Sequence, residues 1–264
     1  MKNYESLLIK RLGKFSSLND GVLYEDKDRK VVVLKEGNGL ELRFIRPDGS
    51  LTSIQSKILI NNPLDLFSDY AKGMTLVTGM IENPQNIVIL GGGGSILMNF
   101  FHNFFPQSKI IGVEINQQVI NIAKNYFGFE ATDNFQIINL DGIKYLENNK
   151  GEIDLLILDI FTNKGQPPQF TTLEFYKLCY SRLSNNGVFC LNIHQSTLFK
   201  ITQNLQSLFG KILKSTTKDS TTYYCFKNND IKLDEIKKRL LVLNNKGFYK
   251  FPVFERMELL TEII

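Results

Sequence analysis

Glycine and acidic residues follow apolar segments of this sequence at a spacing that suits nucleoside binding. Residues 87–90 are continuously apolar, as expected of a parallel strand buried on both faces, and four glycines follow at 91–94. A second apolar run, residues 110–113, ends on Glu114. The glycines allow backbone N–H groups to approach a ligand, and the acid, 23 residues after Gly91 (114 − 91), can accept both ribose hydroxyls. The alternative is a flexible turn between two core strands.

Two more acids stand at the ends of strand-like segments. Asp141 follows one such segment and precedes Gly142, and Asp159 interrupts the most continuous apolar run of the chain. The carboxyl ends of parallel strands line one crevice, so Glu114, Asp141 and Asp159 should lie together. In that crevice Glu114 would hold the ribose, Asp141 would accept from the exocyclic amine of adenine, and Asp159 would lie nearest the reacting end. Each acid alone could instead be a helix N-cap or a surface residue.

Alternating strand-like and helix-like segments are needed to position these residues. They alternate about five times over the later part of the chain and close with a β-hairpin, a pattern that imposes a mostly parallel sheet. Residues 1–20 contain an amphipathic helix, and 22–54 read as a small antiparallel sheet of three or four strands. A helix is expected over 63–82. We divide the chain into residues 1–60, the N-terminal helix and small sheet, and 61–264, the cofactor-binding domain.

Composition is that of a soluble globular protein, with 264 residues of which 43% are apolar and 22% charged. A net charge of +4 is too small to indicate nucleic-acid binding. Cys179, Cys190 and Cys225 form no CxxC pair, and the apolar contexts of Cys190 and Cys225 favour buried thiols. His102 and His194 are too far apart to suggest a metal site. No signal-peptide core and no run of about 20 apolar residues is present, so we expect a cytoplasmic protein without a membrane partner.

The glycine segment does not fit the common nucleotide motifs. GGGGSILM has no glycine at position 96, so the GxGxxG fingerprint of dinucleotide sites is absent. No lysine lies within the glycine loop, which excludes a Walker phosphate loop. A nucleoside without a diphosphate, such as S-adenosylmethionine, suits the segment better.

Several motifs together resemble the spermidine synthase superfamily of class I S-adenosylmethionine-dependent enzymes. They are NIVILGGGGS, IIGVEIN, INLDGIKYL and LLILDI, with TLEFYKL and GVFCLNI after them, and the resemblance spans roughly residues 22–226. Within that superfamily the chain looks closest to the spermidine-synthase-like methyltransferases. FFPQSKIIGVEIN and AKNYFGFEATDNF are similar to segments in the C-terminal domain of the elongation factor 1A methyltransferase.

The resemblance implies an α/β fold of the Rossmann-like class I methyltransferase type, with a mostly parallel seven-stranded sheet and a small N-terminal antiparallel β region. The implied cofactor is S-adenosylmethionine or, in the aminopropyl-transferring branch, its decarboxylated form. The positions that match cofactor-binding positions, or flank them, are Gln55, Gly91, Gly92, Gly93, Gly94, Glu114, Ile115, Asp141, Gly142 and Asp159.

The positions that would bind a polyamine depart from the family pattern. Spermidine synthases show GGGDG and a DxxD pair, whereas this chain has Gly94 and Thr162 in place of one acid of each motif. Ser50 and Ser56 flank Gln55 where acids are expected. A dication in a dry pocket needs carboxylates, and aminopropyl transfer needs an amine that has been deprotonated.

Putrescine should therefore bind weakly, in the millimolar range or worse, at about −4 kcal/mol. Replacing Gly94 and Thr162 by aspartate should improve its binding. Acids from elsewhere in the chain, for instance Asp48 or Glu174, are not placed by the sequence and leave this expectation open.

The leading hypothesis is a methyltransferase whose acceptor is a protein or a small molecule, with Asp159 as the residue that orients or deprotonates an acceptor amine. One alternative is a divergent aminopropyltransferase of polyamine biosynthesis, and another is a non-catalytic nucleoside-binding or dimerisation module. We also expect a homodimer, because apolar strands such as KVVVL (residues 30–34) have little core of their own in so small a sheet.

Overall fold

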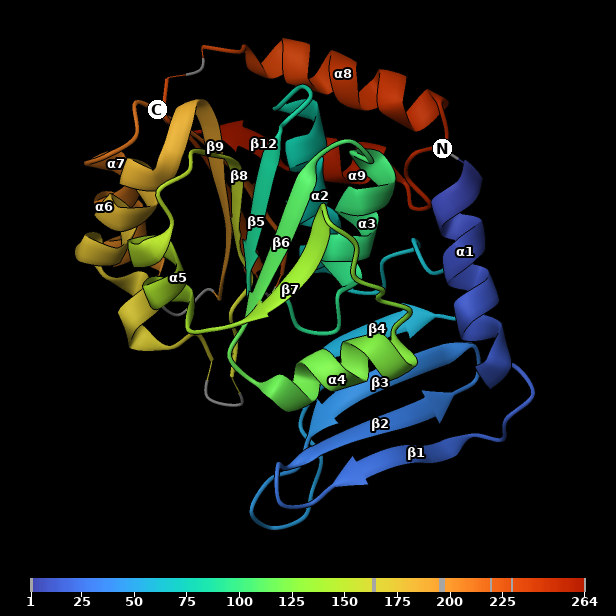
Figure 1. Cartoon of the computed structure of the whole chain (residues 1–264). Helices are drawn as coiled ribbons and strands as arrows, with labels where there is room; N and C mark the ends of the chain where they lie inside the picture. Colours follow the sequence, from blue (N-terminus) through green and yellow to red (C-terminus); the bar gives the residue numbers. More distant parts are fainter. Residues whose placement is uncertain (1, 163–164, 195–197, 219, 229, 264) are drawn as a thin grey trace.

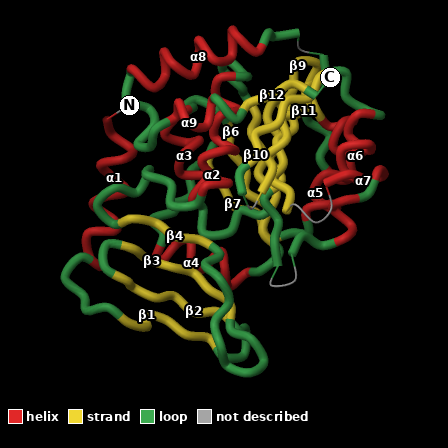
Figure 2. Tube along the Cα trace, turned by 180° about the vertical axis from the view of Figure 1, so that it is seen from behind, coloured by secondary structure: helices red, strands yellow, loops and turns green. Residues whose placement is uncertain are grey.

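The chain folds around one large sheet and one small sheet in the computed structural model (Figure 1). The described residues are 2–162, 165–194, 198–218, 220–228 and 230–263. Both views place the small sheet at one end of the large one, with the first helix alongside (Figures 1 and 2).

The large sheet is mixed and mostly parallel. Its parallel strands are β5 (Asn86–Leu90), β6 (Lys109–Glu114), β7 (Phe135–Asn139), β8 (Ile153–Leu158) and β9 (Leu183–His194). Its antiparallel strands are β10 (Lys211–Thr216), β11 (Ser220–Phe226) and β12 (Leu260–Glu262). The order β12-β10-β11-β9-β8-β5-β6-β7 confirms the predicted fold class and the closing hairpin. Within the described ranges β12 is a short eighth strand that the sequence did not predict.

Helices cover both faces of the large sheet (Figure 1). One face carries α2 (Asp69–Thr75), α3 (Ile96–Phe104), α8 (Leu233–Asn245) and α9 (Val253–Met257). The other face carries α5 (Gly142–Asn148), α6 (Leu173–Arg182) and α7 (Leu198–Gln206). Each face has its own buried apolar cluster, so the parallel strands are apolar on both sides, as their sequence predicts. Two 3-10 helices, η2 (Leu76–Gly79) and η3 (Pro168–Thr171), extend α2 and precede α6.

The N-terminal part packs on the rest of the chain through α4 (Gln117–Tyr126). Val31 and Leu42 of the small sheet share one buried cluster with Val119 and Ile122 of α4. This confirms a small antiparallel sheet and shows that its apolar residues already have a core within the chain. A domain boundary at residue 60 stays a prediction. The elements are α1 (Lys2–Leu12), the 3-10 helix η1 (Gly13–Phe15), β1 (Gly21–Asp26), β2 (Val31–Glu36), β3 (Gly39–Phe44) and β4 (Ser56–Leu59), with strand order β1-β2-β3-β4.

The helix predicted over 63–82 is wrong in its first third. Residues 63–68 form turns and bends, and the N–H of Asp65 donates to the carbonyl of Asn62. Regular helix begins only at α2, after Ser68.

Cys179, Cys190 and Cys225 are free thiols buried in the core, as predicted for Cys190 and Cys225. No helix in the described part of the chain is both long and apolar enough to cross a membrane.

Candidate active site

A cavity of about 510 Å³ lies between the two sheets, at the carboxyl ends of the parallel strands. Leu42 and Phe44 of β3 line one wall, and the residues that end β5, β6 and β8 line the other. Eight of the ten predicted cofactor residues line this main cavity; Gly92 and Gly94 line a smaller pocket beside it. The eight are Gln55, Gly91, Gly93, Glu114, Ile115, Asp141, Gly142 and Asp159.

Close packing within the protein explains why glycines occupy the turn at residues 91–94. Gly91 has φ +91°, and a Cβ there would lie 2.3 Å from the carbonyl oxygen of Asp159, so only glycine fits. The N–H of Gly93 donates to Glu114 Oε2 at 3.2 Å, and that of Gly94 donates to Ser56 Oγ at 3.2 Å. These two N–H groups are therefore used within the protein, whereas the sequence suggested that they face a ligand.

Glu114 is held at the end of β6 by two backbone hydrogen bonds. Its Oε1 accepts from the N–H of Asn116 at 2.9 Å, and its Oε2 accepts from Gly93. Burial raises the pKa of Glu114 above its ordinary value, and the backbone donors oppose that rise. Each carboxylate oxygen keeps a second lone pair, so a fixed pair of acceptors faces the cavity.

Asp141 is a helix N-cap and also lines the main cavity. Its Oδ1 accepts from the N–H groups of Ile143 and Lys144 at 3.0 Å each, which makes it the N-cap of α5. It also lines the main cavity, next to Gly142 and the 69% exposed Ile115. The cap fixes the carboxyl group, and its second oxygen remains for a ligand.

Asp159 lies where the main cavity meets the smaller pocket, since it lines both. Burial raises the pKa of Asp159 to about 8, and no hydrogen bond or cation among the described residues offsets this effect. The carboxylate charge of Asp159, together with burial, raises the pKa of Tyr70 well above its ordinary value. Tyr70 lines both spaces as well, although the sequence suggested only an apolar helix residue.

A second hollow of about 480 Å³ continues from the main cavity. The two share Gln55, Tyr70, Phe161 and Thr162. Its other lining residues are Ser53, Ile54, Phe67, Ser68, Asp69, Asn192, Thr217, Lys218 and Ser220. We call it the acceptor hollow.

Asp69 is the one acid among the described residues that line the acceptor hollow. Its Oδ1 lies 2.5 Å from Arg256 Nη2, so its charge is already compensated. Asn192, at the carboxyl end of β9, is 4% exposed, and its Oδ1 has no hydrogen-bond partner among the described residues. The hollow thus offers little free negative charge and one unused buried acceptor.

Three residues discussed from the sequence lie elsewhere. Ser50 and Asp48 hydrogen-bond each other in an exposed turn and line neither the main cavity nor the acceptor hollow. Glu174 lines a separate surface hollow beside Phe199. The suggestion that Ser50 belongs to the acceptor pocket is therefore wrong, and neither acid supplies the charge that a diamine would need.

Cations at the mouth of the main cavity were not predicted. Arg29 and Lys30 come from the turn between β1 and β2 and line the main cavity. Nothing in the local sequence signals this role, because it depends on how the small sheet packs against α4.

Comparisons with known proteins agree with this geometry. A model of the spermine/spermidine synthase domain matches residues 70–227. Human methyltransferase-like protein 13, solved in complex with SAH, superposes with a TM-score of 0.62 at 21% identity, over 70% of this chain and 94% of that one. A probable spermidine synthase from Corynebacterium glutamicum superposes with a TM-score of 0.69 at 18% identity, over 85% and 88%. At these identities the likeness establishes the fold.

Curated relatives include two kinds of transferase. The polyamine aminopropyltransferase of Chromobacterium violaceum is 32% identical over 164 residues, 62% of this chain and 61% of that protein. That of Neisseria meningitidis serogroup B is 28% identical over 82% of this chain and 84% of that protein. The eEF1A lysine and N-terminal methyltransferase of Mus musculus is 31% identical over 43% of this chain and 18% of that protein. The chain spans less than two thirds of the first and third of these relatives.

Proposed function

The chain belongs to the spermine/spermidine synthase domain family, and from that premise we propose that it transfers a methyl group from S-adenosylmethionine to an acceptor amine. The acceptor is a protein or a small molecule. Relatives in this family include both an aminopropyltransferase and a methyltransferase of protein amines, so the choice between them depends on the acceptor hollow.

The observation that carries the proposal is the charge of that hollow. Its one described acid, Asp69, is paired with Arg256, and Thr162 stands where the DxxD pattern has its second acid. Gly94, in place of the acid of GGGDG, is packed against Ser56 and leaves no room for a larger side chain. A diamine would have to lose its water without gaining fixed carboxylate partners beyond Asp159, which disfavours aminopropyl transfer to putrescine.

The main cavity fits the nucleoside part of the cofactor. Glu114 presents two fixed oxygens for the ribose hydroxyls, Asp141 has an oxygen left for the adenine amine, and Ile115 offers apolar surface to the base. When bound, S-adenosylmethionine supplies a methyl group on a sulfonium. The protein contributes chiefly position, because a methyl group moves in line between donor and acceptor.

Asp159 and Asn192 would handle the acceptor. Methylation of an amine requires its nitrogen to lose a proton, and the Asp159 carboxylate would take that proton. With a pKa of about 8, Asp159 is ionised only in mildly alkaline solution, so the rate should rise with pH up to that range. The Oδ1 of Asn192 in the acceptor hollow, which has no partner among the described residues, would accept a hydrogen bond from the acceptor.

A divergent aminopropyltransferase is the second candidate. The Neisseria relative covers 82% of this chain, and Asp159, the first acid of the DxxD pattern, is retained at the junction of the cavities. This reading requires the decarboxylated cofactor and productive binding of a diamine.

Calorimetry with S-adenosylmethionine, decarboxylated S-adenosylmethionine and methylthioadenosine tests the proposal. We expect the carboxylated cofactor to bind more tightly than the decarboxylated one. The protein mixed with putrescine and the decarboxylated cofactor should yield no spermidine. Tighter binding of the decarboxylated form, or spermidine in that mixture, would contradict methyl transfer, and a lack of binding by all three ligands would indicate a non-catalytic module.

A further inference from the structure

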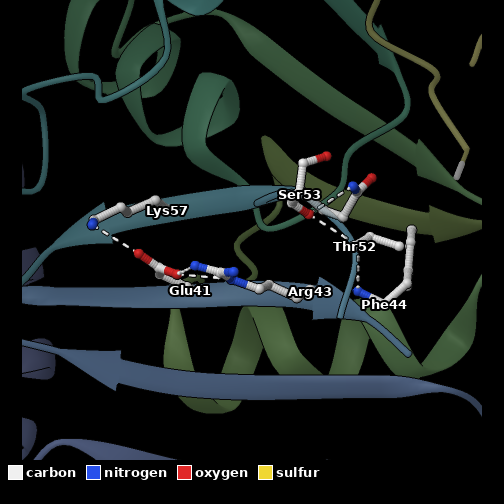
Figure 3. Close-up of polar contacts among 7 residues, drawn as sticks. Glu41, Arg43, Phe44, Thr52, Ser53 and Lys57 are labelled. Carbon is white, nitrogen blue, oxygen red and sulfur yellow. Dashed lines mark hydrogen bonds and ion pairs between the residues drawn. The ribbon is translucent and has the colours of Figure 1, made fainter. Parts of the chain in front are cut away.

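The face of the small sheet that points away from α4 carries a buried ionic cluster in which two cations share one acid (Figure 3). Glu41 of β3 is 0% exposed. Its Oε1 accepts from Lys57 Nζ of β4 at 2.8 Å, and its Oε2 accepts from Arg43 Nε at 2.9 Å and Nη2 at 2.5 Å. We call Glu41, Arg43 and Lys57 the ionic cluster.

The ionic cluster carries one positive charge in excess. Burial alone would raise the pKa of Glu41, but the hydrogen bonds from Lys57 and Arg43 outweigh that effect and hold its pKa below the ordinary value. Glu41 is therefore ionised at neutral pH and neutralises only one of its two partners. Because the Lys57 side chain is only 13% exposed, water compensates the remaining charge poorly, and an anion placed beside it would be stabilised.

One member of the ionic cluster, Lys57, borders a pocket that joins the cofactor cavity. Lys57 lines the smaller pocket together with Phe67, and its ammonium lies 4.5 Å from the centre of the Phe67 ring. The same pocket is lined by Gly92 and Gly94 and joins the main cavity at Gly91, Gly93 and Asp159. Its volume of about 30 Å³ suits roughly two water molecules or one carboxylate, and nothing as large as a phosphate.

Among the described residues that line the smaller pocket, none is an acid with an ordinary pKa that would repel an anion. Asp159 is the one carboxyl group among its described lining residues, and its pKa of about 8 keeps it mostly uncharged at neutral pH. An acid at position 94 would repel a second carboxylate, but Ser56 occupies the space that its Cβ would need. Both features favour an anionic group in this pocket.

We propose that Lys57, held by Glu41, binds the carboxylate of the cofactor's amino-acid tail and thereby selects carboxylated over decarboxylated S-adenosylmethionine. The proposal rests on the function proposed above, since it assigns the nucleoside to the main cavity. Lys57 is then a specificity-determining residue that takes no part in the chemical step.

Comparison of two ligands in matched variants tests this role. S-adenosylhomocysteine carries the carboxylate, and methylthioadenosine lacks it. We expect Lys57→Met to weaken S-adenosylhomocysteine binding about tenfold and to leave methylthioadenosine within about twofold, because one charge-assisted hydrogen bond is lost. Arg43→Met is the control: it removes the same charge from the cluster, but Arg43 lines neither the main cavity nor the smaller pocket. It should weaken S-adenosylhomocysteine binding less than Lys57→Met does, because it removes the excess charge of the cluster but leaves the ammonium that would contact the carboxylate. Lys57→Arg should keep most of the affinity.

An equal loss for both ligands in Lys57→Met would overturn the proposal, because Lys57 would then support the sheet and not the carboxylate. So would unchanged S-adenosylhomocysteine binding in a variant that melts like the parent. A parent protein that prefers decarboxylated S-adenosylmethionine would overturn the proposed methyl transfer itself. The two failures are therefore distinguishable in one set of titrations.

Discussion

The burial of the Asp159 carboxyl group destabilises the folded protein at neutral pH. The folded protein keeps the proton of Asp159 up to about pH 8, whereas the unfolded chain releases it near the ordinary value of 3.8. Between these values the unfolded state binds fewer protons, so this residue lowers the free energy of unfolding as pH rises.

Asp159→Asn should therefore stabilise the protein while abolishing activity. We expect its melting temperature to exceed that of the parent by at least about 2 °C at pH 8.5, since about 1 kcal/mol corresponds to roughly that shift in a chain of this size. The difference should shrink towards pH 4. Equal melting temperatures of parent and variant across this range would show that Asp159 is well solvated.

Glu114→Ala should remove most of the affinity for the cofactor. Two ribose hydroxyls would lose a charge-assisted acceptor worth about 1.5–3 kcal/mol, or roughly a tenfold to hundredfold rise in the dissociation constant of S-adenosylhomocysteine. The circular dichroism spectrum should not change. Glu152→Ala, at an exposed acid outside the cavities, is the matched control. If both variants bind the ligand like the parent, the nucleoside is held elsewhere.

The residues that the sequence predicted for the site are those defined by their place on a strand. Glu114, Asp141 and Asp159 were found because an acid directly after a buried strand is a local pattern, and the carboxyl ends of neighbouring strands must meet. Tyr70 and Asn192 were not predicted, since each has an ordinary helix or strand context and its role depends on packing between distant segments.

The glycine turn and β4 are interlocked through Gly94 and Ser56. A Cβ at position 94 would lie 2.7 Å from Ser56 Cβ, so the expectation that Gly94→Asp would simply add a carboxylate to the pocket needs correction. We expect Gly94→Asp alone to lower the free energy of unfolding by about 1–3 kcal/mol through overpacking. Adding Ser56→Gly should recover at least half of that loss, with Ser56→Gly alone as the control.

Chemical denaturation of the three proteins measures this coupling. If the losses in free energy of unfolding of the two single variants add up in the double variant, Gly94 and Ser56 are not coupled, and the turn accommodates the new side chain without any change at Ser56. Gly94→Asp together with Ser56→Gly and Thr162→Asp therefore tests whether added acids improve diamine binding.

Elements with a strong apolar period were predicted well, and short or irregular ones were not. The alternating strands and helices from β5 to β9 match their predicted order because each strand is a continuous apolar run between turn signals. Residues 63–68 have helix-compatible composition, but burial of Leu64 and Leu66 in the tertiary structure overrides it. β12 has three residues, too few for any period to be visible in the sequence.

We propose that the molecule is a homodimer, although for a different reason from the one that the sequence suggested. The KVVVL segment needs no partner, because Val31 and Val33 are fully buried in the cluster that includes α4. Strand β1 is the edge of the small sheet, and Val22 on it is 61% exposed. An open edge with an exposed apolar residue is suited to pairing with a second copy.

Sedimentation velocity at micromolar concentration should show a dimer, and Val22→Lys should shift it towards monomer by placing a charge on the edge. The melting temperature of that variant at low concentration should be close to that of the parent. A parent protein that sediments as a monomer would argue against pairing through β1.

The main cavity takes one wall from β3 and β4 and the other from the ends of β5, β6 and β8. A ligand held there touches both sheets, so separating them would first require the ligand to leave. A bound ligand would therefore suppress local opening of the small sheet. The backbone amides of β3 and β4 should exchange with deuterium more slowly in proportion to ligand concentration. Substrate supply would thus set how long the small sheet stays open to proteases.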